Sequence, residues 1–520
     1  MRTILITGAT DGIGLALAHL YQREDARLVL IGRRPLSTLT DPLFHRTNYC
    51  QLDLNDEHCM AALSSWLQEQ GIHQLDLVIH NAAVGYVGVP AAQSPANLRA
   101  MVQVNLWAPI ALSHMLFPLV ERARGKLVFI SSVATALPSP EYATYTATKA
   151  ALEGFVRSWQ VELAAEQSPV TLQIIRPGAT RTAMHAKSGA DLQKLRPERF
   201  PSAATVAGFI ASKIAHPTRT ATVGALNRLI YAVAQTIEGL VDFSWQRLHR
   251  RSRALPAGQM TQGERRHCVI TGAADGIGRA LAEAFAEAGY IITGIDVDRE
   301  RAQQLTEAMT TAGHTITFLA ADLAALDDLP TVVEALQERP PIDLFIHNAG
   351  ISAVGPFSSS NLARQRAVLD INFTAPLLLT GQLLHKQLLA PEATFAFISS
   401  LSRFTGYPGA TVYAATKDGI ASYARSLGVA IASAGHHVLT IYPGPTRTAH
   451  ARRYSPDNRR EMKRMPPEQL AALIVQAVQA RRRTLIPGIA NRSAAWLGKL
   501  LPTVAEQLMR RTIYQKLPRP

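Results

Sequence analysis

Cysteine is scarce in this chain, with only three in 520 residues: Cys50, Cys59 and Cys268. Three thiols cannot form a disulfide framework, and no CxxC pair suggests zinc, so we expect reduced thiols and no metal site. No signal peptide precedes the first apolar stretch, and no run of eighteen charge-free apolar residues follows it. We therefore expect neither secretion nor a membrane-spanning helix, and the expected location is the cytoplasm.

Acidic residues are also few relative to basic ones, 39 against 53, which gives a net charge of +14. Such an excess is compatible with nucleic acid, anionic lipid or an anionic cofactor. The basic residues lack interleaved aromatics and match no nucleic-acid-binding motif, so no nucleic-acid partner is expected. Apolar residues at 47% and charged residues at 18% exclude a disordered or fibrous chain.

The chain contains one domain written twice. Five motifs of the first half return in the second in the same order: TGATDGIG as TGAADGIG, HNAA as HNAG, ISS as ISS, YTATK as YAATK, and RPGATRT as YPGPTRT. The offsets stay near 264, so a whole domain is repeated. We predict one domain at 1–250 and another at 264–520, joined by an exposed basic linker at 251–263.

Short apolar runs alternate with helical stretches in both halves. ILIT, a helical stretch over 15–22 and LVLIG open the first half, and HCVIT, RALAEAFAEAG and YIITGID open the second. This alternation is typical of parallel βαβ units. The predicted fold class is α/β, with two tandem Rossmann-type domains, each a doubly wound parallel sheet.

A glycine turn joins the first strand to the first helix of each half. Its residues are Gly8, Gly12, Ile13 and Gly14 in the first half and Gly272, Gly276, Ile277 and Gly278 in the second. Glycine lets the backbone approach a ligand closely, and the following helix N-terminus offers N–H groups to a pyrophosphate. This strand–turn–helix context, present twice, indicates dinucleotide binding.

The residue that ends the second strand indicates which dinucleotide binds. Asp296 can accept hydrogen bonds from both ribose hydroxyls and would repel a 2′-phosphate, which favours NAD in the second half. The first half has Gly32 at that position, followed by Arg33 and Arg34. A cation beside a missing carboxylate favours NADP in the first half.

A tyrosine and a lysine four residues apart occur once in each half, and this spacing puts both on one helix face. The pairs are Tyr145 with Lys149 and Tyr413 with Lys417, and Ser132 and Ser400 stand 13 residues before the tyrosines. A nearby ammonium lowers the pKa of a tyrosine. The tyrosine can then exchange a proton with an alcohol or ketone oxygen while hydride moves to or from a nicotinamide.

Together these motifs resemble the classical short-chain dehydrogenase/reductase family over essentially both halves. The resemblance implies that the tyrosines are the general acid/base, that the lysines lower the tyrosine pKa and bind the nicotinamide ribose, and that the serines polarise the substrate oxygen. The resemblance implies four further pairs of functional residues. Asn105 and Asn372 would hold a water of the proton relay, and Asp53 and Asp322 would contact the adenine. Asn81 and Asn348 would anchor the central strand beside the cofactor, and Thr182 and Thr448 would bind the carboxamide.

One family position differs between the halves. Ala83 stands where the second half, and the usual family pattern, has Gly350. We expect the extra methyl group to be tolerated.

Each half is therefore predicted to transfer hydride between a nicotinamide and a secondary alcohol or ketone. The unequal cofactor positions suggest that one half oxidises and the other reduces, giving net epimerisation or two steps of one pathway. Two alternatives stay open: one catalytic half beside a structural or nucleotide-sensing half, and a non-catalytic NAD(P)-binding scaffold. We expect the halves to form an intramolecular pseudo-dimer or the chain to form a homo-oligomer.

The end of each half carries apolar residues at helical spacing, within 226–241 and 496–508, with basic clusters nearby. Such helices can pack on the protein itself, and an apolar helix flanked by cations also fits a peripheral membrane contact. The tails resemble those of family members acting on lipid-like ketones, which implies a hydrophobic, lipid- or steroid-like substrate. The resemblance places the substrate cover at 183–202 and 449–466.

Overall fold

The computed structural model describes residues 1–236, 242, 244, 266–455, 457–459 and 461–517. The predicted linker at 251–263 and the tail positions 237–241 lie outside these residues. The chain divides into two compact units: one of 1–87, 96–137 and 144–241, and one of 88–95, 138–143 and 242–520.

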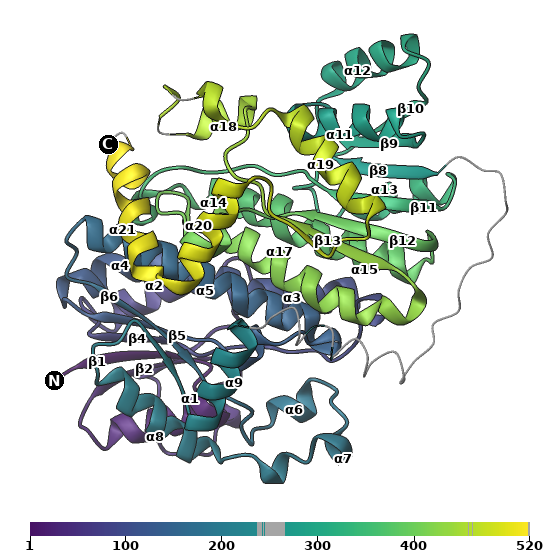
Figure 1. Ribbon diagram of the computed structural model, residues 1–520. Coiled ribbons are helices and arrows are strands. Elements are labelled where there is room, and N and C mark those ends of the chain that lie inside the picture. Colours follow the sequence, from purple (N-terminus) through teal and green to yellow (C-terminus); the bar gives the residue numbers. More distant parts are fainter. Residues whose placement is uncertain (237–241, 243, 245–265, 456, 460, 518–520) are drawn as a thin grey trace. The chain divides into compact units, whose positions relative to one another are not determined.

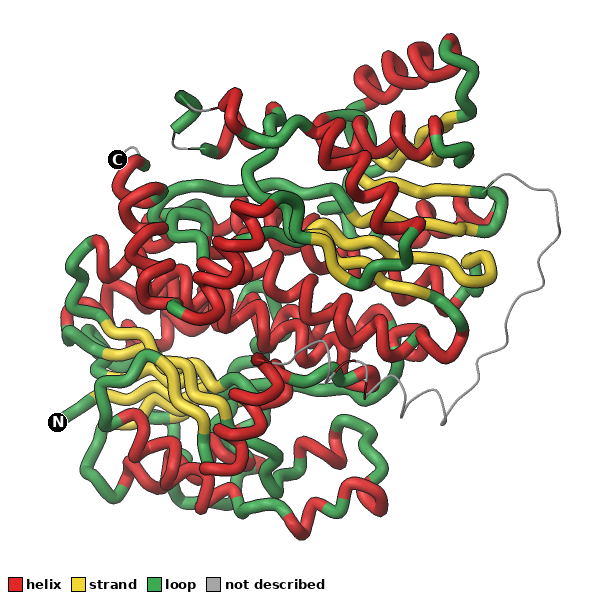
Figure 2. Tube along the Cα trace, viewed as in Figure 1, coloured by secondary structure: helices red, strands yellow, loops and turns green. Residues whose placement is uncertain are grey.

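Each half contains one seven-stranded sheet in which every pair of neighbouring strands is parallel (Figures 1 and 2). The first has the order β3-β2-β1-β4-β5-β6-β7: β1 Thr3–Thr7, β2 Arg27–Gly32, β3 Tyr49–Gln51, β4 Leu77–His80, β5 Lys126–Ile130, β6 Thr171–Arg176 and β7 Thr220–Thr222. The second has the order β10-β9-β8-β11-β12-β13-β14: β8 His267–Thr271, β9 Ile291–Asp296, β10 Ile316–Ala320, β11 Ile342–His347, β12 Leu389–Ile398, β13 His437–Ile441 and β14 Thr484–Leu485. The predicted fold class is confirmed.

Helices flank both sheets (Figure 1). Those of the first half are α1 Gly12–Gln22, α2 Cys59–Glu69, α3 Pro95–Val102, α4 Ala108–Arg122, α5 Ala143–Ala165, α6 Met184–Lys187, α7 Leu192–Leu195, α8 Ala203–Ile214 and α9 Ala225–Thr236. Those of the second are α11 Gly276–Glu287, α12 Arg299–Thr311, α13 Leu329–Gln337, α14 Leu362–Leu369, α15 Ala375–His385, α16 Ser402–Thr405, α17 Thr411–Ala430, α18 Ala449–Tyr454, α19 Pro467–Gln479, α20 Ile489–Leu500 and α21 Pro502–Thr512.

The first strand of each sheet is buried along its whole length, as expected for a strand covered on both faces. Each of these strands runs into the glycine turn and then into α1 or α11. In both sheets the strand order reverses beside this strand, between β1 and β4 and between β8 and β11. Open α/β sheets bind their ligands at such a reversal, at the carboxyl ends of the strands.

The two halves differ after the second strand. In the second half α12 follows β9, and the Asp298 side chain caps it by accepting a hydrogen bond from the Arg301 N–H. The first half has only a short 3₁₀ turn, Leu36–Thr38, between β2 and β3. Asp296, Arg299 and Phe318 therefore line a hollow beside α12 in the second half.

Two helical stretches, 95–122 and 362–385, are long and apolar enough to cross a membrane by length and composition alone. In each, 78% of the apolar window is buried, as in a helix of a protein core. Each is also interrupted by one π-helical turn, Gln103–Trp107 or Asp370–Thr374. These turns hold Asn105 and Asn372.

Candidate active site

The glycine turns have the backbone conformation that their sequence predicts. Gly8 and Gly12 have φ values of +66° and +55°, and Gly272 and Gly276 have +65° and +55°. A Cβ at Gly12 would lie 3.0 Å from Thr182 Cγ2. Any side chain at this glycine would therefore enter the space between the turn and the threonine.

Thr448 stands in the same relation to the second turn, because a Cβ at Gly276 would lie 3.3 Å from its Cγ2. Asp11, before α1, makes no side-chain cap and instead pairs with Lys187 at 2.5 Å. The first N–H groups of α1 are thus not capped by Asp11. A dinucleotide pyrophosphate fits the two turns, since they combine glycine backbone with a helix N-terminus.

The third glycine of each turn allows the helix to approach the strand. A Cβ at Gly14 would lie 2.2 Å from the Gly8 carbonyl oxygen, and one at Gly278 would overlap the Gly272 carbonyl oxygen. No side chain can occupy these positions in this backbone. Ile13 and Ile277, between the glycines, are partly buried and pack against the core of their half.

Asn81 and Asn348 fasten the glycine turn to the neighbouring strand end. Asn81 Nδ2 donates to the Thr7 and Gly8 carbonyl oxygens at 3.0 and 3.3 Å, and Asn348 Nδ2 makes the same pair of bonds, both at 3.0 Å. The Thr7 hydroxyl accepts from the Asn81 and Ala82 N–H groups, each at 3.0 Å. The Thr271 hydroxyl accepts from the Asn348 and Ala349 N–H groups in the same way. The sequence analysis names neither threonine, although a Thr-Gly pair begins the glycine motif of each half.

The position expected to select the cofactor differs in its contacts. Asp296 accepts hydrogen bonds from the Ala274 N–H at 2.9 Å and the Asp298 N–H at 3.1 Å. At Gly32 a Cβ would lie 2.6 Å from Thr10 Cγ2, so the threonine methyl group leaves no room for a side chain at this position. Arg33, next to it, is exposed. The role of Thr10 was not foreseen.

Asp53 and Asp322 both follow the third strand of their sheet and are exposed. Asp53 Oδ1 accepts a hydrogen bond from the Asn55 N–H at 3.0 Å, and Asp322 Oδ1 accepts one from the Ala324 N–H at 2.8 Å. Each carboxylate therefore accepts a hydrogen bond within the turn that follows its strand.

Each tyrosine–lysine pair lies on one helix, α5 or α17, as the spacing predicts. The Lys149 Nζ is 5.9 Å from the centre of the Tyr145 ring, and the Lys417 Nζ is 5.6 Å from that of Tyr413. Both ammonium groups donate to a carbonyl oxygen at the end of the fifth strand, that of Ile130 or Ile398, at 2.9 Å. The lysines are thus fixed beside the ring rather than left free in solvent.

Burial dominates the titration of these groups. It lowers the pKa of Lys149 and of Lys417 to about 8, opposed at Lys149 by nearby Glu153. Burial raises the pKa of Tyr413 to about 12; Tyr407 adds to this rise, and a hydrogen bond with Ser400 opposes it. The sequence predicts that the lysine lowers the pKa of the tyrosine, but in the second half burial has the largest effect and raises the pKa of Tyr413.

Ser132 and Ser400 begin the turn that follows the fifth strand. The Ser132 hydroxyl accepts from the Ala134 N–H at 3.1 Å, and that of Ser400 from the Ser402 N–H at 3.2 Å. Both are only partly buried. These bonds orient each hydroxyl at the carboxyl end of the sheet.

The two asparagines of the π-helical turns have matching contacts. Asn105 is fully buried, accepts from the Val84 N–H and donates to the Val84 carbonyl oxygen, both at 2.8 Å. Asn372 makes the same pair of bonds with Ile351, at 2.8 and 2.9 Å. A Cβ at Gly350 would lie 3.2 Å from Asn372 Oδ1 and 3.4 Å from Lys417 Nζ, so the glycine keeps the space between them open.

The cover segment of the first half lies over its tyrosine. A Cβ at Gly85 would lie 3.1 Å from Met184 Cε and 3.7 Å from Tyr145 Cδ2. The Val87 N–H donates to the Ser188 carbonyl oxygen at 2.8 Å and so fastens the cover to the loop after β4. Met184 therefore places an apolar side chain on the same side of Gly85 as the Tyr145 ring.

In the first half, a buried ion pair lies behind the turn that follows the fifth strand and contains Ser132. The sequence analysis does not predict this ion pair. Arg176 binds Glu153 through two bonds of 2.8 and 2.6 Å. Glu153 also accepts from the Ser131 hydroxyl at 2.6 Å, and Tyr231 of α9 stacks under the Arg176 guanidinium at 4.5 Å. The only sequence signal was a single acid within the apolar stretch ALEGFV.

An asparagine of each tail helix lies against the PG motif. A Cβ at Gly178 would fall 2.4 Å from Asn227 Nδ2, and at Gly444 one would come within 2.4 Å of Asn491 Oδ1. In the sequence this contact is indicated only by the Asn-Arg pair that is repeated near the end of each half. The asparagine contact holds α9 and α20 against the loops that carry Thr182 and Thr448.

The described residues contain no group of three His, Cys, Asp or Glu that could hold a metal ion. The three cysteines are buried and unbonded to one another. Burial raises the pKa of Cys50 and of Cys59 to about 11, so both are thiols at neutral pH.

Comparison with known proteins gives one family for both halves. The family model described as short chain dehydrogenase matches residues 2–193 and 266–459. The bovine protein Dehydrogenase/reductase SDR family member 7B is 30% identical over 191 residues, which cover 34% of this chain and 58% of the relative. The 11-beta-hydroxysteroid dehydrogenase A of Arachis hypogaea is 30% identical over 186 residues, covering 34% and 52%.

The chain thus spans less than two thirds of these relatives' lengths. Among solved structures, a short-chain dehydrogenase from Sphingobium yanoikuyae in complex with NADPH is 24% identical, with a TM-score of 0.39, and the match covers 50% of this chain and 99% of that one. The two matches of the family model together span most of the described chain. The chain therefore belongs to the short chain dehydrogenase family and contains two domains of that family in tandem.

Proposed function

We propose that each half is an NAD(P)-dependent oxidoreductase site that transfers hydride between a nicotinamide and a secondary alcohol or ketone. The observation that carries this proposal is the same constellation in both halves. A half-buried tyrosine lies beside a buried lysine, with a serine at the end of the fifth strand and an asparagine in a π-helical turn. A glycine turn suited to a dinucleotide stands at the same edge of each sheet.

The chain's own residues would handle the substrate oxygen and its proton. Ser400 and Tyr413 would hold the oxygen, and the tyrosine, with a pKa raised to about 12, is protonated at neutral pH and can donate to a ketone. Lys417 would orient the nicotinamide ribose from its place beside the ring. The nicotinamide, when bound, would accept or supply the hydride, and its oxidised form would favour the tyrosinate by its positive charge.

The proposed cofactors are NADP for the first half and NAD for the second. Exposed Arg33 beside Gly32 supports the first assignment, since a guanidinium suits a 2′-phosphate. Asp296 supports the second, because its carboxylate is held by two N–H groups at the strand end. With unlike cofactors, one half would oxidise an alcohol and the other reduce a ketone, giving net epimerisation or two steps of one pathway.

One observation favours the alternative of a single fully competent half. Gly350 leaves room between Asn372 and Lys417, whereas the first half has Ala83 at the matching position. Against the expectation that this methyl group is tolerated, the alternative holds that it crowds the place of a relay water. This alternative predicts slower turnover in the first half, with unimpaired cofactor binding.

A hydrophobic substrate is proposed from the apolar cover of the first site, where Met184 lies near the Tyr145 ring. A relative that is a hydroxysteroid dehydrogenase supports a lipid- or steroid-like alcohol or ketone. We also propose a cytoplasmic protein in contact with a membrane at its periphery. Its active form would be an intramolecular pseudo-dimer or a homo-oligomer.

Titration calorimetry of the full chain tests this function. NADPH and NADH are titrated into wild type, Arg33→Ala and Asp296→Ala. We expect two sites of opposite preference, with Arg33→Ala weakening only the NADP site and Asp296→Ala only the NAD site. One shared preference would remove the two-direction hypothesis, and binding without any ketone- or alcohol-dependent turnover would favour the non-catalytic scaffold.

A further inference from the structure

The last two helices of the second half, α20 and α21, expose an apolar stripe. Six large apolar side chains on the two helices and the residue between them are exposed: Ile489, Trp496, Leu500, Leu501, Val504 and Leu508. Trp496 is 65% exposed and Leu500 is 67% exposed. Burial of such large apolar side chains would be favourable in free energy. Their spacing of three, four and seven residues puts them on one side of each helix.

The opposite side of this helix pair packs on the protein. Ala495, Gly498 and Ala505 are buried, and Gly498 lies directly against the Phe404 carbonyl of α16. The small residues allow the close approach, and they leave the large ones pointing outward. The exposed stripe is therefore a fixed outer face and not a frayed end.

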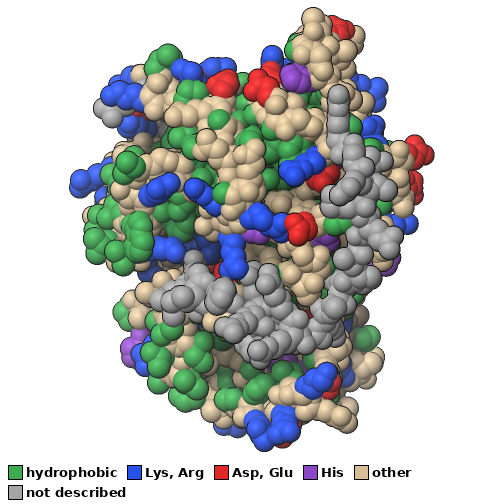
Figure 3. All heavy atoms as spheres, turned by 45° about the vertical axis from the view of Figure 1, so that its right-hand side comes forward, with side chains coloured by type: hydrophobic (Ala, Val, Ile, Leu, Met, Phe, Trp, Pro, Cys, Tyr) green, Lys and Arg blue, Asp and Glu red, His purple; other side chains and the backbone are tan. Residues whose placement is uncertain are grey.

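The charge around the stripe is mainly positive. Residues 489–512 contain four basic side chains, Arg492, Lys499, Arg510 and Arg511, against one acid, Glu506. Three consecutive arginines, 481–483, precede α20 and are exposed. Figure 3 shows Lys and Arg side chains close to hydrophobic ones on the surface that it draws, together with some Asp and Glu side chains. A partner for this surface needs an apolar layer bordered by negative charge.

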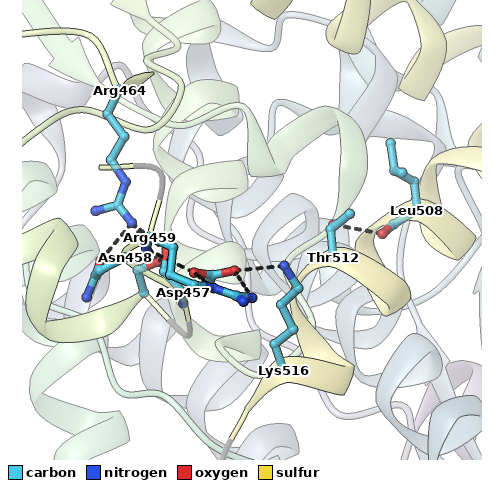
Figure 4. A network of polar contacts seen from close by, with 8 residues as sticks. Asp457, Asn458, Arg459, Arg464, Leu508, Thr512 and Lys516 are labelled. Atoms are coloured by element: carbon cyan, nitrogen blue, oxygen red, sulfur yellow. Dashed lines mark hydrogen bonds and ion pairs between the residues drawn. The ribbon is translucent and has the colours of Figure 1, made fainter. Parts of the chain in front are cut away.

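The end of α21 is tied to the cover segment of the second site. Lys516 pairs with Asp457 at 2.9 Å, and the Asp457 carbonyl oxygen accepts from Arg464 at 2.9 Å (Figure 4). A Cβ at Gly409, four residues before Tyr413, would overlap the Leu517 side chain. The helix pair thus borders the substrate side of the second site.

We propose that the outer face of α20 and α21 docks the second half on an anionic lipid surface. Apolar side chains would enter the interfacial layer while the flanking cations meet anionic headgroups. A second copy of the chain fits less well, because pairing two such faces would bring together helices that each carry a positive excess. Docking would let a hydrophobic substrate pass from the lipid surface to the second site. This role of the docking rests on the function proposed above.

Vesicle sedimentation of the full chain tests the proposal. The vesicles are phosphatidylcholine alone and a 3:1 mixture of phosphatidylcholine with phosphatidylserine. We expect binding to the mixed vesicles that is at least tenfold tighter than to the neutral ones. Trp496→Gln/Leu500→Gln and, separately, Arg510→Gln/Arg511→Gln should each weaken it about tenfold or more.

A matched control comes from α9, whose stripe includes Leu229 and Val233, both exposed. Leu229→Gln/Val233→Gln should bind vesicles as wild type does. Calorimetric titration of all variants with NADH and NADPH should be unchanged, so that loss of docking is distinguished from loss of the proposed enzyme function.

Three results would overturn the docking proposal. The first is that wild type binds both kinds of vesicle equally or binds neither. The second is that Leu229→Gln/Val233→Gln loses binding while Trp496→Gln/Leu500→Gln keeps it. The third is that wild type is a dimer that binds no vesicles and that Trp496→Gln/Leu500→Gln converts to a monomer. The last result would assign the face to a second copy.

Discussion

Placing an aspartate at residue 32 tests how the first half selects its cofactor. A Cβ there would lie 2.6 Å from Thr10 Cγ2, closer than packed atoms tolerate, and 3.0 Å from the Tyr49 hydroxyl, a tight contact that a small shift of that side chain relieves. The second half has Ala274 in place of Thr10, and its N–H donates to Asp296. Gly32→Asp alone should therefore distort the turn and weaken both cofactors. Thr10→Ala/Gly32→Asp should reproduce the second half's arrangement.

The size of the expected switch follows from the contacts that are gained and lost. Two hydrogen bonds from ribose hydroxyls to a carboxylate, at about 1.5 kcal/mol each, add about 3 kcal/mol to NAD binding, or about 150-fold. A carboxylate about 4 Å from a 2′-phosphate costs about 4 kcal/mol per pair of charges at an effective dielectric constant of 20. Solvent exposure reduces this to about half, so NADP binding should weaken by about 30-fold.

The assay is calorimetric titration of NADH and NADPH into the full chain, with the unmodified second site as internal control. The double variant should bind NAD at both sites, while the single variant should lose affinity for both cofactors at the first. A double variant that keeps its NADP preference, or a single variant that switches equally well, would refute the argument from Thr10.

Three further predictions concern the second-half lysine, its neighbouring glycine and the buried ion pair. Gly350→Ala should lower second-site kcat about tenfold without changing NADH affinity, because its methyl group would crowd Asn372; unchanged steady-state kcat would contradict this. Burial lowers the pKa of Lys417 from 10.5 to about 8. Between pH 8 and 10.5 the unfolded chain therefore binds more protons than the folded chain. The free energy of unfolding should rise by about 3 kcal/mol over this pH range. Denaturant melts should show a smaller rise in Lys417→Met, and an equal rise would contradict the assignment. Glu153→Gln should destabilise the first half by about 3 kcal/mol by leaving Arg176 unpaired. The second half has Ala421 and Tyr442 at these two positions. Denaturant melts of Glu153→Ala/Arg176→Tyr should therefore show that part of the loss is recovered, and no recovery would refute this prediction.

The sequence predicts most of what repeats between the halves. Strand–turn–helix order and glycine spacing are local, so the positive φ at Gly12 and the helix that follows could be read from one segment. The Tyr145–Lys149 pair also follows from helix geometry alone. Such features depend on neighbours in sequence, and motif spacing records them.

What the sequence could not predict depends on contacts between distant segments. The methyl group of Thr10 blocks a side chain at Gly32 only because β1 and β2 lie side by side. Glu153 and Arg176 come from a helix and a strand 23 residues apart and become a pair only in the fold. The raised pKa of Tyr413 likewise reflects burial, which no residue spacing contains.

The most direct test of two hydride-transfer sites is to remove one tyrosine hydroxyl at a time. Wild type, Tyr145→Phe and Tyr413→Phe are assayed for NADPH-dependent reduction of hydrophobic ketones and NAD-dependent oxidation of the matching alcohols. The account predicts that Tyr145→Phe abolishes only the NADPH reaction and that Tyr413→Phe abolishes only the NAD reaction. Loss of both reactions in one variant, with no effect of the other, would contradict it.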